Sequence, residues 1–325
     1  MKCTNKHPKI RLLCLSCIAA IFMSACGSTE KEALENAYPL YSSTVSGSTT
    51  GSFFAENLCV TENFDYGTDQ TDSQVAEGAG AFNLDTQEVL YSQNLFGKLY
   101  PASTTKILTA YIIIRGGNLD DTVTVSETAV ANMEGSSVCG IRAGDVLTVR
   151  DLLYGLMLVS GNDAANALAE YYSGSVEAFA EVMNEEALRL GATNSHFTNA
   201  NGLPDDNHYT TVYDMYLIFQ EAIQLQEFVT LIHTESIDVT YQDGSGNPVT
   251  KTWSNTNRYV NGDNAAPDGI TVIGGKTGTT NAAGYCLVLY STNEKGEDIV
   301  SIVFKADGRS NLYLLMDQIL SKFAN

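Results

Sequence analysis

Positive charge is scarce in this sequence. Its 325 residues include 18 lysines and arginines against 38 aspartates and glutamates, which gives a formal net charge of −20 at pH 7. A surface this acidic repels the phosphate backbone of DNA or RNA, so the composition argues against nucleic acid as a partner. We interpret the excess of acidic residues as a contribution to solubility.

Histidine is scarce as well, and two common hydrolase motifs are missing. Only four histidines occur, and none stands in the His-Glu-x-x-His pattern that binds zinc. No Gly-x-Ser-x-Gly segment is present, which argues against a Ser-His-Asp hydrolase. His208 and Asp214 flank a predicted helix start, where we expect capping or surface groups. The sequence indicates no metal and no other cofactor.

The N-terminal apolar run is short. It extends from Leu12 to Met23, follows a basic stretch and precedes Cys26, and it is too short to span a bilayer comfortably. The pattern resembles a bacterial lipoprotein signal, although Met23 stands where leucine is usual. We therefore predict a signal peptide over residues 1–25 and a lipid on Cys26, with an ordinary signal peptide as the alternative. The protein would be exported and held by this lipid on the outer face of the cytoplasmic membrane.

Few cysteines remain behind this leader. Beyond Cys26 the sequence holds Cys59, Cys139 and Cys286. An odd number of cysteines does not predict a full disulfide framework. Cys286 falls within a predicted core strand, where a thiol behaves as a small hydrophobic group.

The composition changes twice along the chain. Residues 26–57 are rich in Ser, Thr, Gly and Glu, which is typical of a flexible tether. Residues 58–325 are predicted to form one folded domain, beginning with a possible short strand over residues 58–60. We expect no further β-rich domain at the C-terminus.

Strands are predicted near both ends of the folded part and helices between them. The predicted strands cover residues 79–84, 88–91, 123–125, 284–290 and 299–304. The predicted helices cover residues 150–159, 164–172, 176–190, 211–225 and 312–323, besides one that begins near Pro101. This order favours an α+β fold in which the two ends share a sheet and the helices form a second lobe.

The helix that begins near Pro101 carries a candidate nucleophile. Proline suits a first helical turn, and Ser103 and Lys106 stand three positions apart, so they share one helix face. A serine is a weak nucleophile until a base accepts its proton. A lysine can be that base if burial or a nearby cation lowers its pKa. Free N–H groups at the helix N-terminus would face a developing oxyanion.

Two further short motifs follow along the chain. Ser160-Gly161-Asn162 lies at a polar corner between two predicted helices, and Lys276-Thr277-Gly278-Thr279 precedes the strand predicted over residues 284–290. Each motif alone is a weak signal. In the order Ser-x-x-Lys, Ser-x-Asn, Lys-Thr-Gly they form the set found in penicillin-binding proteins and class A β-lactamases.

With these motifs, the sequence resembles the serine D-alanyl-D-alanine carboxypeptidases, the low-molecular-mass penicillin-binding proteins of peptidase family S11. Residues 197–199 and 202–203 add to the resemblance, which runs from about Leu58 to the C-terminus. It implies a β-lactamase/transpeptidase-like fold, with an antiparallel sheet flanked by helices beside an all-helical lobe. It also implies peptidoglycan stem peptides ending in D-Ala-D-Ala as substrates and β-lactam antibiotics as covalent inhibitors.

The resemblance implies a catalytic role for four residues. Ser103 would attack the carbonyl between the two D-alanines and form an acyl-enzyme. Lys106 would accept its proton, with a pKa lowered by Lys276. Ser160 would relay a proton to the departing D-alanine, and Asn162 would orient Lys106 and the substrate amide.

The same resemblance implies a binding site for the substrate's terminal carboxylate. That group would be held by Lys276, Thr277, Gly278 and Thr279, and the backbone N–H groups of Ser103 and Thr279 would form the oxyanion hole. Arg309 would fork onto the carboxylate or, alternatively, be a surface arginine.

Other functions remain as alternatives. A D,D-endopeptidase that cuts crosslinks would use the same residues. A class A β-lactamase would need a glutamate in a Glu-x-x-Leu-Asn loop; Glu185 precedes Leu188, but Arg189 replaces the asparagine and the segment is predicted to be mid-helix. A non-catalytic peptidoglycan- or penicillin-binding module is disfavoured because all the catalytic residues are present.

Overall fold

The two ends of the folded chain share one antiparallel sheet. The computed structural model describes residues 57–325, so the predicted signal peptide, the predicted lipid site at Cys26 and the tether up to residue 56 lie outside the described residues. The sheet has the strand order β2-β1-β9-β8-β7. Its strands are β1 (Gly78–Asn83), β2 (Glu88–Gln93), β7 (Thr271–Thr280), β8 (Gly284–Thr292) and β9 (Asp298–Ala306).

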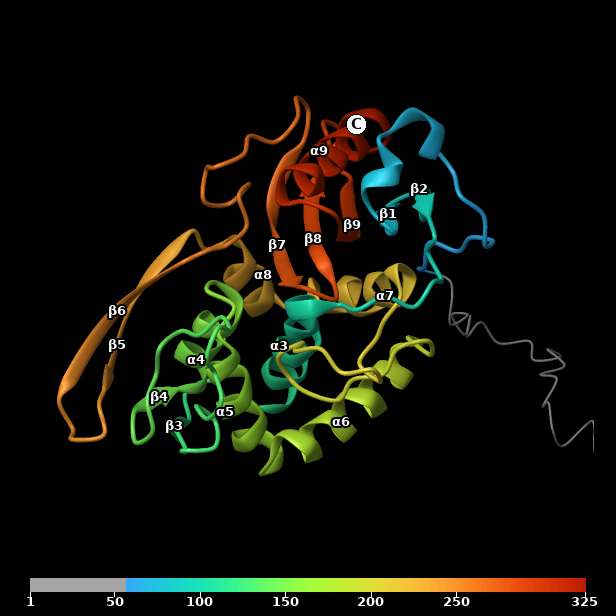
Figure 1. Ribbon diagram of the computed structural model, residues 1–325. Coiled ribbons are helices and arrows are strands. Elements are labelled where there is room, and N and C mark those ends of the chain that lie inside the picture. The colour runs from blue at the N-terminus through green and yellow to red at the C-terminus, as the bar shows by residue number, and fades with distance from the viewer. Residues whose placement is uncertain (1–56) are drawn as a thin grey trace, which may run out of the picture. The chain divides into compact units, whose positions relative to one another are not determined.

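Helices cover both faces of this sheet. One face packs against α9 (Arg309–Ile319), which continues into a π-helical turn, Leu320–Ala324. The other face packs against α7 (Val212–Ala222) and α8 (Gln226–His233) (Figure 1). Because both faces are covered, nearly every residue of β1 and β9 is buried. Buried and exposed positions therefore do not alternate along these two strands.

The remaining helices form the second lobe. Its centre is α3 (Lys106–Gly116), whose first eight residues are all buried, as expected for a helix that is apolar on every side. The other helices of the lobe are α4 (Val149–Met157), α5 (Asn162–Ser173) and α6 (Val176–Arg189). Thr148 and Ser175 cap α4 and α6 by accepting a backbone N–H. This arrangement confirms the predicted α+β fold with a sheet and a helical lobe.

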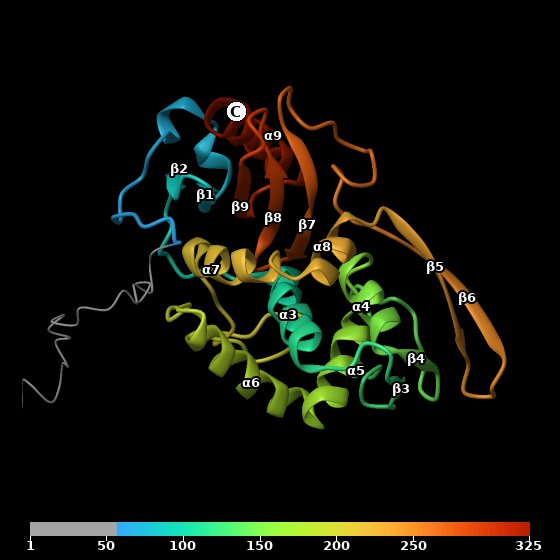
Figure 2. The ribbon, with the colours of Figure 1, turned by 180° about the vertical axis from the view of Figure 1, so that it is seen from behind.

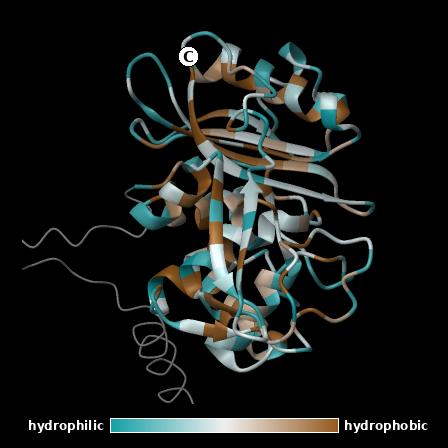
Figure 3. Ribbon diagram, turned by 90° about the vertical axis from the view of Figure 1, so that its left-hand side faces the viewer, coloured by the Kyte–Doolittle hydropathy of each residue, from teal (hydrophilic) through white to brown (hydrophobic). Residues whose placement is uncertain are grey.

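A second sheet extends from the helical lobe. It has the order β3-β4-β5-β6 and consists of β3 (Thr122–Thr124), β4 (Val146–Thr148), β5 (Ser236–Gln242) and β6 (Pro248–Ser254). Strand β5 pairs with β4 only at its last residue, and the β5–β6 hairpin lies at the side of the lobe (Figures 1 and 2), where one face packs through the buried Val239, Tyr241 and Trp253. Apolar residues concentrate in the packed strands and helices, whereas the peripheral loops are largely hydrophilic (Figure 3).

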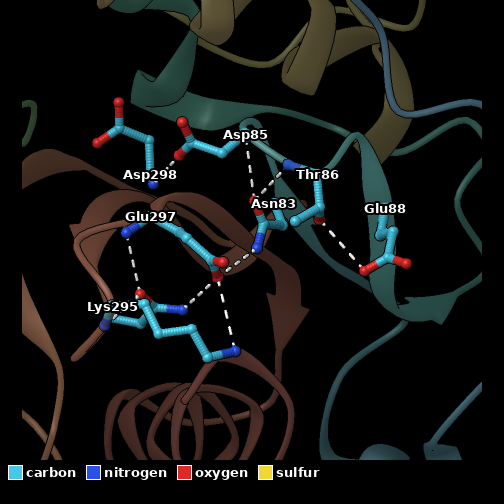
Figure 4. A network of polar contacts seen from close by, with 8 residues as sticks. Asn83, Asp85, Thr86, Glu88, Lys295, Glu297 and Asp298 are labelled. Atoms are coloured by element: carbon cyan, nitrogen blue, oxygen red, sulfur yellow. Dashed lines mark hydrogen bonds and ion pairs between the residues drawn. The ribbon is translucent and has the colours of Figure 1, made fainter.

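A polar network ties two hairpin turns of the large sheet together (Figure 4). Asn83 accepts the N–H groups of Asp85 and Thr86 at its Oδ1, and its Nδ2 donates to Glu297 Oε2 at 2.9 Å. The N–H of Asp298 donates to Asp85 Oδ2 at 2.6 Å. The β1–β2 turn is therefore fixed to the β8–β9 turn, although the two are distant in sequence.

The structure corrects the predicted strand over residues 58–60. Cys59 is buried, but its backbone groups form hydrogen bonds with tyrosine side chains and not with a neighbouring strand. Its N–H donates to Tyr216 Oη at 2.9 Å, and Tyr213 Oη donates to its carbonyl at 2.9 Å. The predicted C-terminal helix begins three residues earlier than expected, at Arg309. Within the described residues, none of the helices is both long and apolar enough to cross a membrane.

Candidate active site

Ser103 lies in a short 3-10 helix, Ala102–Thr105, directly before α3. The preceding Ala102 has φ +48°, a left-handed conformation that costs a non-glycine residue about 1–2 kcal/mol. The backbone of Gly202 passes so close that an added Cβ would lie 1.9 Å from the Ala102 carbonyl oxygen. A Cβ on Gly278 would lie 3.0 Å from Ser103 N. Neighbouring backbone therefore fixes the position of Ser103, and α3 itself begins three residues later.

Lys106 is fully buried beneath Ser103. Its Nζ donates to Ser103 Oγ at 3.0 Å, to Asn162 Oδ1 at 2.7 Å and to the Asn201 carbonyl at 2.6 Å. Burial lowers the pKa of Lys106 well below its ordinary value, the nearby Lys276 lowers it further, and the carboxylate of Asp163 opposes the shift. The larger cause is thus burial rather than Lys276, and it favours the neutral amine that a general base requires.

Lys276 forms a second lysine–serine pair. Its Nζ donates to Ser160 Oγ and to the Thr277 carbonyl, each at 3.0 Å. Burial lowers the pKa of Lys276 to about 7. Ser160 has φ +61° at the corner between α4 and α5, so this corner is a second strained position in the site.

The predicted residues divide between the wall of a cleft and the layer beneath it. A cleft of about 380 Å³ is lined by Ser103, Ser160, Thr277, Gly278, Thr279 and Arg309, among others. Lys106, Asn162 and Lys276 are buried below that surface. Arg309 is exposed, and its guanidinium lies 5.9 Å from the centre of the Tyr285 ring. It is therefore a surface residue that also lines the cleft.

Strand β7 provides one wall of the cleft and is an edge strand of the large sheet. Thr277 Oγ1 is 2.7 Å from Thr256 Oγ1, so the loop after β6 reaches the same edge. Within the described sheet no strand pairs with the other side of β7. An extended peptide can therefore bind along this edge through backbone hydrogen bonds.

Sequence reasoning missed several contributors to the site. Asn201 contributes only its carbonyl to Lys106, and a carbonyl has no side-chain signature. Ser137, Arg258 and Tyr313 also line the cleft, from segments whose positions depend on the fold. The loop of Asn201 does lie within the stretch that carried the family resemblance.

The expectation that His208 and Asp214 are capping or surface groups was wrong. Both are buried. His208 Nε2 is 2.8 Å from Thr105 Oγ1, and burial lowers the pKa of His208 to about 4. The Asp214 carboxylate accepts the N–H of Asn194 at 2.7 Å, and the N-cap of α7 is Thr211. The His208 contact joins the loop before α7 to the 3-10 helix that precedes α3, and the Asp214 contact joins the same loop to α7, since a buried polar group must be hydrogen-bonded.

The glutamate considered for a β-lactamase does not reach the cleft. Glu185 is exposed in the middle of α6 and does not line the cleft. The mid-helix position predicted for this residue is confirmed.

A sheet whose edge strand carries Lys-Thr-Gly, facing an active serine on a helical lobe, defines the penicillin-binding class of serine enzymes. The chain belongs to the D-alanyl-D-alanine carboxypeptidase family, Peptidase_S11, whose family model matches residues 67–308.

Characterised relatives are similar over most of the folded part. The D-alanyl-D-alanine carboxypeptidase DacF of Bacillus subtilis is 35% identical over 238 residues, which are 71% of this chain and 57% of the relative. The D-alanyl-D-alanine carboxypeptidase of Streptomyces sp. strain K15 is 35% identical over 241 residues, 70% of this chain and 80% of that protein. This chain thus matches little more than half the length of DacF.

Solved structures show the same fold. The crystal structure of the Streptomyces K15 DD-transpeptidase superposes with a TM-score of 0.71 at 31% sequence identity. The match covers 81% of this chain and 98% of that one.

Proposed function

We propose that this protein is a serine-type D-Ala-D-Ala carboxypeptidase that acts on peptidoglycan stem peptides through an acyl-enzyme on Ser103. One observation carries the proposal: Lys106 Nζ lies 3.0 Å from Ser103 Oγ in a buried site that favours the neutral amine. The family membership supports the same chemistry. The chain's relatives are named carboxypeptidases.

In the proposed reaction, neutral Lys106 accepts the Ser103 proton as Oγ attacks the carbonyl carbon of the penultimate D-alanine. The oxyanion is stabilised by the N–H groups of Ser103 and Thr279, consistent with the close approach of β7 to Ser103. Ser160 passes its proton to the amide nitrogen as the C–N bond breaks and D-alanine leaves, and Lys276, 3.0 Å away, replaces that proton. Water then attacks the ester carbonyl and gives a proton through Ser160 to Lys276, while Lys106 returns its proton to Ser103 Oγ as the ester bond breaks.

The terminal carboxylate of the substrate is held at the β7 edge. Thr277, Gly278, Thr279 and Arg309 line the cleft, and Arg309 can donate two parallel hydrogen bonds to a carboxylate. Lys276 is beneath the surface and contributes positive charge to this end of the cleft without lining it. β-Lactam antibiotics, which carry a carboxylate and a reactive amide, would acylate the same serine.

A second candidate function has one specific support. The solved K15 relative is described as a DD-transpeptidase, an enzyme that passes the acyl group to an amine. An amine acceptor, or a crosslink in a D,D-endopeptidase reaction, would use the same serine and lysine.

The site of action follows from the N-terminal sequence. Residues 1–25 have the pattern of a lipoprotein signal, and Cys26 would carry the lipid that attaches the protein to the outer face of the cytoplasmic membrane. Expression in a bacterium should place the protein in the membrane fraction with residue 26 at its N-terminus. A mature N-terminus elsewhere would contradict this assignment.

The activity is tested by incubating the purified protein with an acylated peptide that ends in D-Ala-D-Ala and measuring released D-alanine. Release by the wild type and none by Ser103→Ala is the expected result. Fast hydrolysis of penicillin without release of D-alanine would instead identify a β-lactamase.

A further inference from the structure

Asp163 has a buried carboxylate next to the catalytic residues. It follows Asn162 in the first turn of α5 and is 1% exposed. Among the ion pairs of residues 57–325, none includes Asp163. A buried charge without a cation is costly unless hydrogen bonds stabilise it, so its partners explain why it is there.

Backbone N–H groups provide those hydrogen bonds. Asp163 Oδ1 accepts from Cys139 N at 2.9 Å and Ala164 N at 2.9 Å. Its Oδ2 accepts from Gly140 N at 2.8 Å and Ile141 N at 3.2 Å. Three of these four donors are consecutive residues of the loop between β3 and β4, so one side chain determines the path of that loop.

The same loop reaches the cleft. Its Ser137 lines the cleft, and the Ser137 carbonyl accepts the N–H of Asn162 at 2.8 Å. Strand β6 holds the loop from its other side: Trp253 Nε1 donates to the Cys139 carbonyl at 3.1 Å, and Lys251 donates to the Gly140 carbonyl. Without the Asp163 contacts, this segment would keep its hydrogen bonds to β6 and to the Asn162 N–H and the packing of its buried Cys139 and Ile141 side chains.

Among residues 57–325, Asp163 is the acidic group that acts on Lys106. The charged or titratable groups that influence Lys106 are Lys276 on β7, His208 before α7 and Asp163 on α5. His208 is neutral at physiological pH because burial lowers its pKa to about 4. The Cys139 thiol beside Asp163 also stays neutral, because burial raises its pKa. The Asp163 carboxylate directly follows Asn162, whose Oδ1 accepts from Lys106 Nζ at 2.7 Å, and its charge raises the pKa of Lys106.

We propose that Asp163 is a positioning residue, which holds the Ser137–Ile141 loop at the cleft and supplies the negative charge that stabilises Lys106 once it is protonated. This inference rests on the proposed function. When Ser103 attacks, its proton moves to Lys106 and a positive charge appears in a buried site beside Lys276. An anion fixed by four N–H groups lowers the free energy of that charge without needing to move.

Asp163→Asn removes both contributions. The amide keeps one acceptor oxygen, but its NH₂ group would face the N–H groups of Gly140 and Ile141, which donate to Oδ2 in the wild type. We expect the rate of acylation by a fluorescent penicillin to fall about 10- to 100-fold, as for a misplaced catalytic group. Because the Asp163 charge raises the pKa of Lys106, its loss should move the acidic limb of the acylation pH profile to lower pH.

Asp151→Asn is a matched control. Asp151 lies in the first turn of α4 and accepts the Thr148 N–H at 3.3 Å, within a capping box that is separate from Lys106. The Asp151→Asn variant should have lower thermal stability, but the acidic limb of its acylation pH profile should stay at the wild-type position. Lys251→Met removes a loop contact without changing the charge of Asp163, so it should slow acylation with no shift of the limb.

Each outcome decides the proposal. A limb that stays in place in Asp163→Asn, or loss of activity only in proportion to the fall in melting temperature, would overturn it. If Asp163→Asn does not fold, amide hydrogen exchange of the wild type decides, because the N–H groups of residues 139–141 should be protected. Rapid exchange there would overturn the proposal. Failure of the wild type to acylate or to release D-alanine would instead refute the proposed function.

Discussion

Lys276 Nζ donates to Ser160 Oγ at 3.0 Å, and the two residues are 116 positions apart in the sequence. The same distance separates Lys106 Nζ from Ser103 Oγ, only three positions apart. The site thus holds two lysine–serine pairs, one local and one formed across the cleft. In the proposed mechanism the first generates the nucleophile and the second delivers a proton to the leaving group.

Covalent labelling tests the first pair. A labelled penicillin should acylate the wild type at Ser103, and Ser103→Ala should abolish labelling because it removes the proposed nucleophile, whereas Ser160, the other lysine-paired serine of the cleft, is proposed only to relay a proton. Ser245→Ala, at the exposed tip of the β5–β6 hairpin, should label normally. Peptide mapping by mass spectrometry gives the modified residue. Label retained by Ser103→Ala would refute the assignment.

The lifetime of the penicilloyl-enzyme separates the carboxypeptidase from the β-lactamase. General-base activation of water contributes typically ~10²–10⁴ in rate, and Glu185 is exposed on α6 and does not line the cleft. The penicilloyl-enzyme should therefore persist far longer than the acyl-enzyme of a D-Ala-D-Ala peptide, and Glu185→Gln should not change its lifetime. Intact-protein mass spectrometry over time measures both. Rapid loss of the penicilloyl group would favour the β-lactamase instead.

The buried amine of Lys276 should make stability depend on pH. Its pKa falls from 10.5 to about 7 on folding, so between about pH 7 and pH 10 the unfolded chain binds more protons than the folded one. The free energy of unfolding should therefore rise with pH across this window, and the rise should be smaller in Lys276→Met. Urea unfolding at several pH values provides the comparison. Parallel curves for the two proteins would show that Lys276 titrates normally.

Gly202 and Gly174 offer a matched pair of substitutions. Both have positive φ, +87° and +83°, but a Cβ on Gly174 would meet nothing within 4 Å. Gly174→Ala should cost about 1–2 kcal/mol of stability through backbone strain alone and leave acylation intact. Gly202→Ala should cost more, because its Cβ would meet the Ala102 carbonyl, and it should displace Ser103 and slow penicillin acylation strongly. Equal acylation rates in the two variants would contradict this account.

The local chemistry of the site could be predicted from short motifs in the sequence. The spacing of three positions predicted that Ser103 and Lys106 share one helical face, and in the structure Ser103 lies in a 3-10 helix that runs directly into α3 at Lys106. The α+β class followed from strands at both ends and helices between them. The motif set then identified the family, since three short patterns in one order are far more specific than any of them alone.

The groups that surround the two lysines could not be predicted from the motifs, because they come together only in the folded protein. The carbonyl of Asn201, the N–H groups that bind Asp163 and the burial of His208 depend on loops brought together from distant parts of the chain. Backbone donors and acceptors are the same in every residue, so the side-chain pattern cannot show which of them will be used. The pKa values of Lys106 and Lys276 depend mainly on burial, which is a property of the packed protein and not of the motif.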